Sequence, residues 1–257
     1  MLSLKNFSIK RGENCVVDGV NLDFVPKKIY AILGPNGAGK SSFIRGIFGE
    51  LRFCGEVFLG GEKFSHKKGW KKHFGYMPQD IGIDVNLSAL EVVLLGNLDE
   101  LGVRVSDEQL FEALGVMGYL GIAHLANRDI SSLSGGQRQM IFFAQVLLKN
   151  PKVLLLDEPV SALDMHHQCV LLDCLRKQTR EKELITLVIL HDLSLASEFC
   201  DEIIFLHHSR IWARGLPSQI LEYSLLQDIY KVNAKIFYDD RGTPAVIAKS
   251  AILEELR

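Results

Sequence analysis

Continuous apolar runs mark the strands around which this chain is expected to fold. They cover residues 29–33, 153–156, 184–190 and 203–206. Runs of this kind, without a polar residue at every second position, are typical of parallel strands that are buried on both faces. Residues 163–180, between the second and third runs, have a helical pattern, as a right-handed crossover between parallel strands requires. The pattern predicts an α/β core.

The remaining stretches predict a strand-rich first portion and a helical insertion. Polar and apolar residues alternate over residues 1–10, and short strand-like pieces occur at 57–59 and 74–76. From about residue 86 to 149 the pattern becomes helical. Ser88 with Glu91 and Ser106 with Gln109 match capping boxes, which place helix starts at the two serines. We expect a single domain over 1–257, with a helical subdomain at about 86–149 and a short tail at about 216–257.

Composition and charge describe an ordinary folded protein. The chain has 257 residues, of which 47% are hydrophobic and 23% charged, and its net charge of −2 gives no reason to expect a nucleic-acid partner. The first ten residues alternate like a strand, which is not the pattern of a signal peptide. No apolar stretch approaches the roughly 18 residues that a membrane span needs. If the protein works at a membrane, another chain must supply the spans.

The cysteines and the basic run favour structural explanations. The five cysteines are scattered and lack metal-ligand spacing, which suits free thiols in a reducing cytosol. The basic run, formed by Lys67, Lys68, Lys71 and Lys72, is interpreted as a solvated face in preference to a contact with anionic lipid.

Two histidine pairs, His166–His167 and His207–His208, raise the possibility of a metal site. Adjacent residues on a helix point in different directions, and no nearby cysteine or carboxylate set completes a ligand shell. We interpret both pairs as solvated or interface histidines.

A phosphate-binding loop follows the first apolar run. The segment fits the pattern GxxxxGK[ST], and its residues are Gly34, Pro35, Asn36, Gly37, Ala38, Gly39, Lys40 and Ser41. Its glycines let backbone N–H groups turn toward a polyphosphate beside the positive end of the helix that follows. Lys40 can reach the β- and γ-phosphates, and the Ser41 hydroxyl can bind Mg²⁺. The segment predicts binding of a nucleoside triphosphate.

Two adjacent carboxylates, Asp157 and Glu158, follow the run at 153–156. They therefore lie at the carboxyl end of a strand, which is the edge where ligands bind in open α/β sheets. Asp157 can hold Mg²⁺ through its water shell, and Glu158 can polarise an attacking water. Beside a phosphate loop, this pair points to hydrolysis of the nucleotide.

A second anion site is predicted at the start of another helix, which is expected to run from about residue 138 to 149 and is preceded by Ser134, Gly135, Gly136 and Gln137. Such a helix start offers backbone N–H groups, a hydroxyl and a positive dipole end. Alone it could be a plain N-cap. A second anion site on a chain with one nucleotide loop makes sense if the two sites belong to different protomers that share one nucleotide.

Taken together and in their order along the chain, the motifs resemble those of the nucleotide-binding subunit of an ATP-binding-cassette (ABC) transporter. The set comprises Gly34–Ser41, Gln79, the LSGGQ segment 133–137, residues 154–158, the segment 161–164 and His191. The resemblance spans nearly the whole chain. It implies a P-loop NTPase core with an N-terminal antiparallel β subdomain and an inserted α-helical subdomain. It also implies an ATPase with ATP and Mg²⁺ as ligands.

The resemblance implies roles for the residues around the phosphate loop. Lys40 would bind the terminal phosphates and Ser42 the α-phosphate. The residues implied for Mg²⁺ are Ser41, Asp157 and Gln79, and the last would also sense the attacking water and relay its state to a membrane partner. Glu158 would act as the general base, and His191 would contact the γ-phosphate.

Further roles concern the opposite subunit and the adenine base of ATP. Ser134, Gly135, Gly136 and Gln137 would bind ATP held by the opposite subunit, and Asp164 would line the dimer seam. The family usually stacks an aromatic residue on adenine from the first β segment, where this chain has Arg11. A guanidinium can also stack on a flat ring.

Other segments resemble the branch of the family that serves ferric-siderophore, haem and cobalamin importers. They are residues 92–96, 163–168, 191–196, 232–237 and 242–246. This likeness implies import of a metal chelate by two copies of the chain with membrane permease subunits, and indirectly with a periplasmic or extracellular binding protein. The chain would then be peripheral, at the cytoplasmic face of the inner membrane.

Three alternatives remain open from the sequence. The first is a molybdate-type oxyanion importer of a related system. The second is a soluble ABC ATPase of iron–sulfur assembly, DNA repair or translation, although the chain has a single cassette and no long coiled coil. The third is an idle module that binds ATP without hydrolysing it, against which the presence of Glu158 and His191 argues.

Overall fold

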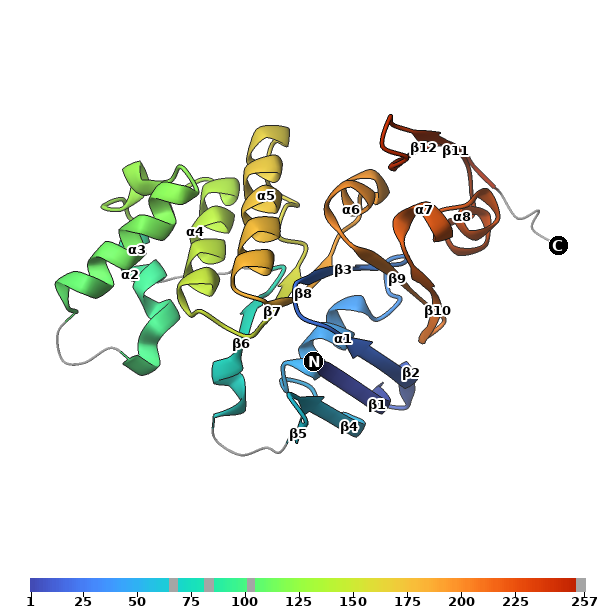
Figure 1. The fold of residues 1–257 in the computed structure, drawn as a ribbon, viewed down its shortest axis with the longest axis horizontal. Coiled ribbons are helices and arrows are strands. Elements are labelled where there is room, and N and C mark those ends of the chain that lie inside the picture. Colours follow the sequence, from blue (N-terminus) through green and yellow to red (C-terminus); the bar gives the residue numbers. More distant parts are fainter. Residues whose placement is uncertain (65–68, 81–85, 101–104, 253–257) are drawn as a thin grey trace.

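A six-stranded sheet forms the centre of the molecule (Figure 1). The computed structural model describes residues 1–64, 69–80, 86–100 and 105–252. In spatial order the strands are β10 (Arg210–Gly215), β9 (Glu202–His207), β3 (Lys28–Leu33), β8 (Ile185–Ile189), β7 (Val153–Asp157) and β6 (Phe74–Met77). All neighbours run parallel except β10, which pairs antiparallel with β9. The predicted α/β core is confirmed. The continuous apolar runs coincide with β3, β7, β8 and β9, and the run at 184–190 extends one residue beyond each end of β8.

The apolar runs are continuous because both faces of this sheet are covered. Successive side chains of a strand point to opposite faces. Tyr30 and Leu155 accordingly belong to one buried cluster, whereas their chain neighbours Ala31 and Leu154 belong to another. The sheet therefore separates two hydrophobic cores.

The first core lies between the central sheet and a four-stranded antiparallel sheet. The order in the second sheet is β2 (Asn14–Phe24), β1 (Leu2–Arg11), β4 (Cys54–Leu59) and β5 (Glu62–Lys63). Helix α1 (Lys40–Ile47) contributes buried residues to this core, and its Phe43 meets Phe7 of β1 edge to face with ring centroids 5.8 Å apart. The expected antiparallel β subdomain is thus present.

Helices cover the other face of the central sheet. They include α4 (Gly135–Leu148), α5 (Met165–Glu181) and α6 (Leu193–Phe199). Helices α2 (Ala89–Leu94) and α3 (Asp107–Tyr119) pack beside α4 in a helical region at one end of the molecule (Figure 1). The 3₁₀ turns η2 (Leu95–Glu100), η3 (Ala123–Leu125) and η4 (Ile130–Ser132) connect these helices, and η1 (Trp70–His73) precedes β6.

The predicted capping boxes form at both serines. The Ser88 and Ser106 hydroxyls accept hydrogen bonds from the N–H groups of Glu91 and Gln109, whose side chains accept from the serine N–H groups in return. Helix α4 begins at Gly135, earlier than its expected start at about residue 138. The reason is that the Ser134 side chain itself is the N-cap, so residues 135–137 form the first helical turn.

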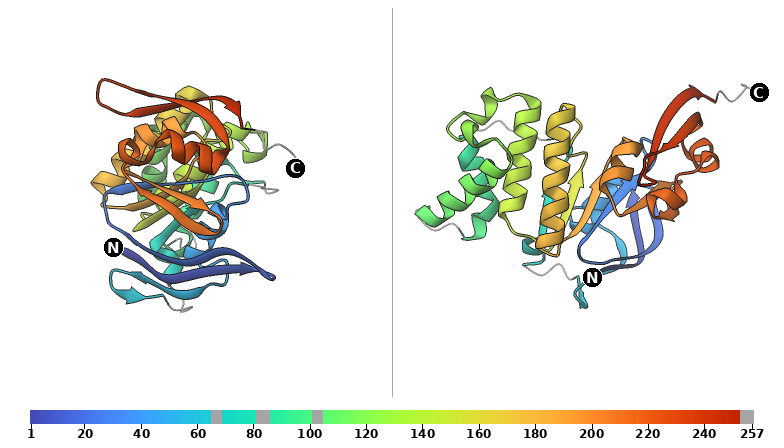
Figure 2. Two further views of the ribbon diagram at one scale, coloured as in Figure 1. Left: turned by 90° about the vertical axis from the view of Figure 1, so that its right-hand side faces the viewer. Right: turned by 45° about the horizontal axis from the view of Figure 1, so that its top comes forward.

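The C-terminal segment packs at the other end of the molecule (Figure 2). It comprises α7 (Pro217–Ile220), α8 (Tyr223–Tyr230) and a hairpin of β11 (Val232–Tyr238) and β12 (Pro244–Ala251). Arg241 joins this hairpin to α6 by donating to both carboxylate oxygens of Glu198 at 3.0 Å. None of the helices in the described ranges is long and apolar enough to cross a membrane.

Candidate active site

Four parallel strands bring polar residues to one edge of the central sheet. Gly34 follows β3, Gln79 lies just beyond β6, Glu158 follows β7 and His191 lies just beyond β8. The carboxyl ends of parallel strands meet at one edge, so these residues come together although they are far apart in the chain. A cavity of about 500 Å³ lies at this edge, and Gly34 is not among the described residues that line it. The lining is Arg11, Val16, Asn36, Gly37, Gly39, Lys40, Ser41, Ser42, Gln79, Glu158 and His191.

The phosphate loop opens one wall of this cavity with backbone N–H groups. Gly39 is the N-cap of α1 and has a left-handed φ of 100°. A Cβ atom there would lie 2.4 Å from the Val16 carbonyl oxygen, so no larger residue fits. The Ala38 N–H donates to the Pro35 carbonyl at 3.2 Å and tightens the loop. Because α1 has no side-chain cap and no acidic residue in its first turn, its N–H groups and dipole are available to an anion.

Lys40 is held at the mouth of this loop. The residue is 6% exposed, and its Nζ donates to the carbonyl oxygens of Gly34 at 2.8 Å and Pro35 at 3.0 Å. Burial lowers the pKa of Lys40, and the nearby carboxylates of Glu158 and Asp157 oppose this shift. A phosphate group in the cavity would give this buried cation the negative charge that the loop carbonyls supply only in part.

Ser41 and Asp157 place a hydroxyl beside a carboxylate, with Ser41 Oγ donating to Asp157 Oδ1 at 3.1 Å. Burial raises the pKa of Asp157, and the hydrogen bond from Ser41 opposes the shift. Both groups are hard oxygen ligands. Across the described ranges no three His, Cys, Asp or Glu side chains cluster as a metal cage. This donor set fits Mg²⁺, which commonly takes one or two protein ligands together with water and phosphate oxygens.

The Glu158 carboxylate is held by two neighbouring side chains. Gln79 Nε2 donates to its Oε2 at 2.9 Å, and His191 Nε2 lies 2.5 Å from its Oε1. Glu158 has a left-handed φ of 53°, which is uncommon for a residue other than glycine. The arrangement brings a candidate base, an amide and an imidazole to the edge where the phosphate loop opens.

The second anion motif lies apart from this cavity. Ser134 caps α4, its Oγ accepting from the Gln137 N–H at 3.2 Å while Gln137 Oε1 accepts from the Ser134 N–H at 3.1 Å. Asp164 caps α5 by accepting from the His167 N–H at 2.9 Å. The residues predicted for a second protomer, which are Ser134, Gly135, Gly136, Gln137 and Asp164, are absent from the described lining of the cavity. Within one chain the structure therefore separates the two groups.

Two residues at the site were not predicted from the sequence. Val16 of β2 lines the cavity beside Arg11, but in the sequence it looks like any other apolar strand residue. Gln139 is 4% exposed and donates to the Glu158 carbonyl oxygen at 2.9 Å. In the sequence, Gln139 could have been recognised only as a polar residue that directly precedes five apolar or small residues, all of which are buried in α4.

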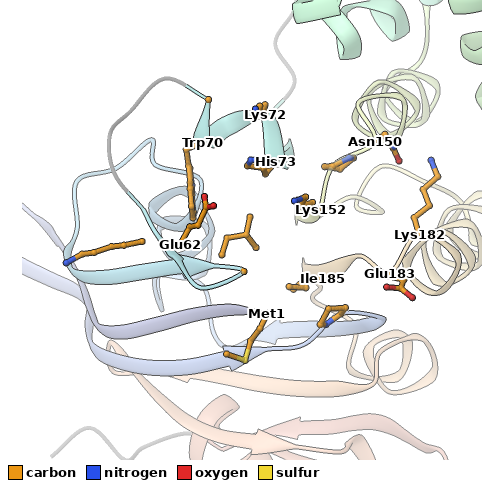
Figure 3. Close-up of a pocket in the computed structure, with 16 residues that line it drawn as sticks. Met1, Glu62, Trp70, Lys72, His73, Asn150, Lys152, Lys182, Glu183 and Ile185 are labelled. Atoms are coloured by element: carbon orange, nitrogen blue, oxygen red, sulfur yellow. The ribbon is translucent and has the colours of Figure 1, made fainter.

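A larger hollow of about 840 Å³ lies at the opposite edge of the sheet (Figure 3). Its lining includes Pro26, His73, Lys152 and Glu183, which precede β3, β6, β7 and β8. Of the basic side chains labelled in Figure 3, Lys182 extends toward Asn150 and away from Trp70. Within the described residues, the contacts among Gln79, Glu158 and His191 belong to the smaller cavity and not to this hollow.

The remaining chemistry-bearing residues have local contacts. All five cysteines are free, and Cys174 and Cys200 are buried. His167 Nδ1 contacts Asp164 at 2.8 Å, and the rings of His207 and His208 lie 3.9 Å apart at their centroids.

In the basic run, Lys71 lies over the Phe48 ring at 4.6 Å, while Lys67 and Lys68 fall outside the described residues.

Comparisons with known proteins all point to one family. A family model described as "ABC transporter" matches residues 17–161. The hemin import ATP-binding protein HmuV of Pseudomonas fluorescens is 36% identical over 97% of this chain and 100% of its own length. The same-named protein of Plesiomonas shigelloides is 32% identical over 91% of this chain and 96% of its own length.

Two solved structures are similar over most of the chain. A metal-chelate type ABC transporter in an inward-facing conformation matches with a TM-score of 0.82 and 25% identity, over 97% of both chains. A dimeric bacterial ABC transporter cassette matches with a TM-score of 0.77 and 27% identity, over 84% of this chain and 99% of its own.

Proposed function

This chain belongs to the ABC transporter ATPases, and from that premise we propose that it powers the import of a metal chelate, with haem as the first candidate. The observation that carries the proposal is the set of relatives named for hemin import, whose similarity extends over nearly the whole chain and includes the tail. The likeness to a metal-chelate type transporter supports the same cargo class. The ATP-hydrolysing activity itself follows from membership of the family.

Hydrolysis would take place in the cavity at the carboxyl edge of the sheet. The N–H groups of the phosphate loop and the Lys40 amine would hold the β- and γ-phosphates, and Ser42 would lie near the α-phosphate. The Glu158 carboxylate would accept a proton from water as the water oxygen bonds to the γ-phosphorus. The bond from this phosphorus to the bridging oxygen then breaks, and ADP and phosphate are released.

The neighbours of Glu158 would keep its carboxylate in position. Gln79 and His191 contact one carboxylate oxygen each, so the group cannot rotate without breaking a hydrogen bond. His191 would also reach the γ-phosphate, and Gln79 would report the state of the site to a membrane partner. Ser41 and Asp157 would hold Mg²⁺, which when bound neutralises phosphate charge.

A second copy of the chain would complete each site. Ser134, Gly135, Gly136, Gln137 and Asp164 lie away from the cavity of their own chain, as expected if they serve the ATP of a partner. In the capping box, Ser134 Oγ accepts from Gln137, which leaves its own O–H as a donor for a phosphate oxygen. The similar bacterial cassette is dimeric, which supports a sandwich of two chains around two ATP molecules.

The assembly would include membrane permease subunits and, indirectly, a binding protein outside the membrane. The chain would then lie peripherally at the cytoplasmic face. We treat residues 1–257 as a single ABC ATPase domain, with the helical subdomain at about 86–149 and a C-terminal tail at about 216–257. Closure of the two chains around ATP would drive the permease, and hydrolysis would reopen the pair.

The test is ATP hydrolysis by the complex, purified with its permease and placed in lipid vesicles. The panel is haem, a ferric siderophore, cobalamin and molybdate, each presented with its binding protein, and Glu158→Gln in the same complex is the control. We expect haem to stimulate phosphate release. Stimulation by molybdate alone would contradict import of a metal chelate and favour import of an oxyanion. A chain recovered without permease subunits and indifferent to all four would favour the soluble ABC ATPases.

A further inference from the structure

Gln139 connects two motifs that lie far apart in the sequence. It lies in α4, five residues beyond Ser134, and is 4% exposed. Its Nε2 donates to the Glu158 carbonyl oxygen at 2.9 Å, and its Oε1 accepts from the Ala162 N–H at 3.1 Å. One side-chain amide therefore satisfies both ends of the turn formed by residues 158–162.

A second and independent contact seats the start of α4 on the same turn. A Cβ atom at Gly136 would lie 2.8 Å from the Ala162 carbonyl oxygen and 3.3 Å from Leu163 Cδ2. The helix start and the turn thus approach as closely as a glycine allows. Because this packing is tight, a displacement of one would displace the other.

The turn itself depends on such support. Glu158 has the uncommon left-handed φ of 53°, and its carbonyl oxygen accepts from both Gln139 Nε2 and Ser161 Oγ, the latter at 3.1 Å. A residue in this conformation persists where its surroundings hold it. The backbone that carries the Glu158 carboxylate is therefore fixed in part by a side chain of α4.

We propose that Gln139 is a positioning residue that couples the two ATP sites of the dimer. The proposal rests on the function proposed above, in which Ser134 contacts the ATP of the second copy while Glu158 acts on the ATP of its own copy. Gln139 joins the backbones that carry these two groups. The nucleotide state of one site then reaches the other through the 158–162 turn, Gln139 and the first turn of α4.

The test uses dimers of the full-length chain in which two differently tagged copies are purified through both tags. The first copy carries Glu158→Gln, so turnover is limited to the site formed by Lys40 and Glu158 of the second copy and Ser134 of the first. Gln139→Met, which removes both hydrogen bonds at similar side-chain length, is then placed in either copy. When Gln139→Met is in the first copy, that chain already lacks its general base Glu158, so any loss of turnover arises at the site of the second copy.

We expect Gln139→Met in the first copy to lower the remaining turnover about tenfold, because its effect travels through Ser134. The ATP affinity of the single chain should stay within about twofold of the unmodified value, since Gln139 does not line the cavity. If turnover is lost only when the substitution is in the second copy, Gln139 positions only Glu158 of its own chain, and the proposed coupling is wrong. No loss in either placement would overturn the proposal as well.

Controls separate coupling from folding and from the proposed function. Gln145→Met, at a half-buried position further along α4, should leave turnover unchanged. Gln139→Glu keeps the acceptor for Ala162 but loses the donor to Glu158, so it serves if the methionine variant does not fold.

As a second readout, Gln139→Met in both copies should bring the Hill coefficient for ATP close to 1; an unchanged coefficient would count against coupling. Absence of ATP hydrolysis by the unmodified dimer would contradict the proposed function, before any Gln139 variant is compared.

Discussion

Glu158 and Glu183 lie at opposite edges of the central sheet and share an unusual backbone conformation. Their φ angles are 53° and 55°, and they flank the neighbouring strands β7 and β8. Glu158 is held by Gln79 and His191 beside the phosphate loop. Glu183 contacts Lys27 at 2.8 Å, with both side chains more than half exposed. A left-handed backbone therefore does not by itself distinguish the candidate base Glu158 from Glu183; the side-chain partners and the edge of the sheet distinguish them.

The contrast extends to the two edges as a whole. At the carboxyl edge, α1 begins directly after the phosphate loop, so N–H groups and the positive dipole end point into the cavity. At the amino edge, the residues that precede the same strands line a larger hollow, from which Lys182 extends toward Asn150 (Figure 3). Cavity size is thus a poor guide here, because the smaller cavity has the donors and carboxylates that face one another.

The strongest test of this contrast exchanges each glutamate for its amide. Glu158→Gln should lower turnover about 10²- to 10⁴-fold, since it removes the general base, while ATP binding persists and an ATP-bound dimer accumulates. Glu183→Gln should leave turnover unchanged. Phosphate release and size-exclusion chromatography with ATP measure both effects. Near-normal turnover of Glu158→Gln would remove Glu158 from the role of base.

A second test compares lysines at the two edges. Lys40→Ala should weaken ATP binding about tenfold to a hundredfold, because a charge-assisted contact to phosphate is worth about 1.5–3 kcal/mol. Lys152→Ala, at the amino edge, should bind ATP normally. Titration of the single chain with a fluorescent ATP analogue measures the affinity. Equal affinities for the two variants would contradict the phosphate-loop interpretation.

A third test asks whether the carboxyl edge of one chain is sufficient for ATP hydrolysis or needs Ser134 of a second chain. Ser134→Ala should lower turnover about tenfold through the lost contact to the partner's ATP, without changing ATP affinity of the single chain. Ser106→Ala removes the same kind of capping box from α3, at a similar cost of about 1 kcal/mol in stability. If both serine variants lose turnover equally, the effect of Ser134→Ala is one of stability alone.

The smallest expected effect concerns the stability of the empty site. Burial raises the pKa of Asp157, so the folded chain binds this proton more readily than the unfolded chain. The corresponding stability is present at low pH and is lost as pH rises through the raised pKa. At neutral pH the free energy of unfolding of the Asp157→Asn variant should therefore be about 1 kcal/mol higher than that of the unmodified chain. This difference should vanish at low pH, where Asp157 of the unmodified chain becomes protonated.

Urea unfolding of the nucleotide-free chain at several pH values measures this difference. Asp173→Asn, at an exposed position of α5, is the matched control and should leave the unfolding free energy unchanged at each pH. A destabilised Asp157→Asn variant at neutral pH would mean that the charged carboxylate is favoured by its surroundings.

Local patterns predicted the elements that depend on near neighbours. The capping boxes at Ser88 and Ser106 form because all their partners lie within three residues. The start of α4 was displaced by about one turn, since Ser134 takes the capping role that the sequence left ambiguous.

The phosphate loop, Gln79, Glu158 and His191 come together because they follow parallel strands of one sheet, which share a carboxyl edge. Arg11 reaches the same cavity from the end of β1 in the antiparallel sheet. The catalytic and binding roles assigned to them stay predictions until the substitutions above are measured.

By itself, the sequence determined the phosphate loop, the strand-end carboxylates and the buried strands, since each is specified by spacing or periodicity within a short window. Only the tertiary structure placed Val16 against Gly39, joined Gln139 to the 158–162 turn and separated Ser134 from the cavity of its own chain. The physical reason is that these relations depend on how the elements pack. Residues more than about twenty positions apart meet through close packing of whole helices and sheets, which no local pattern encodes.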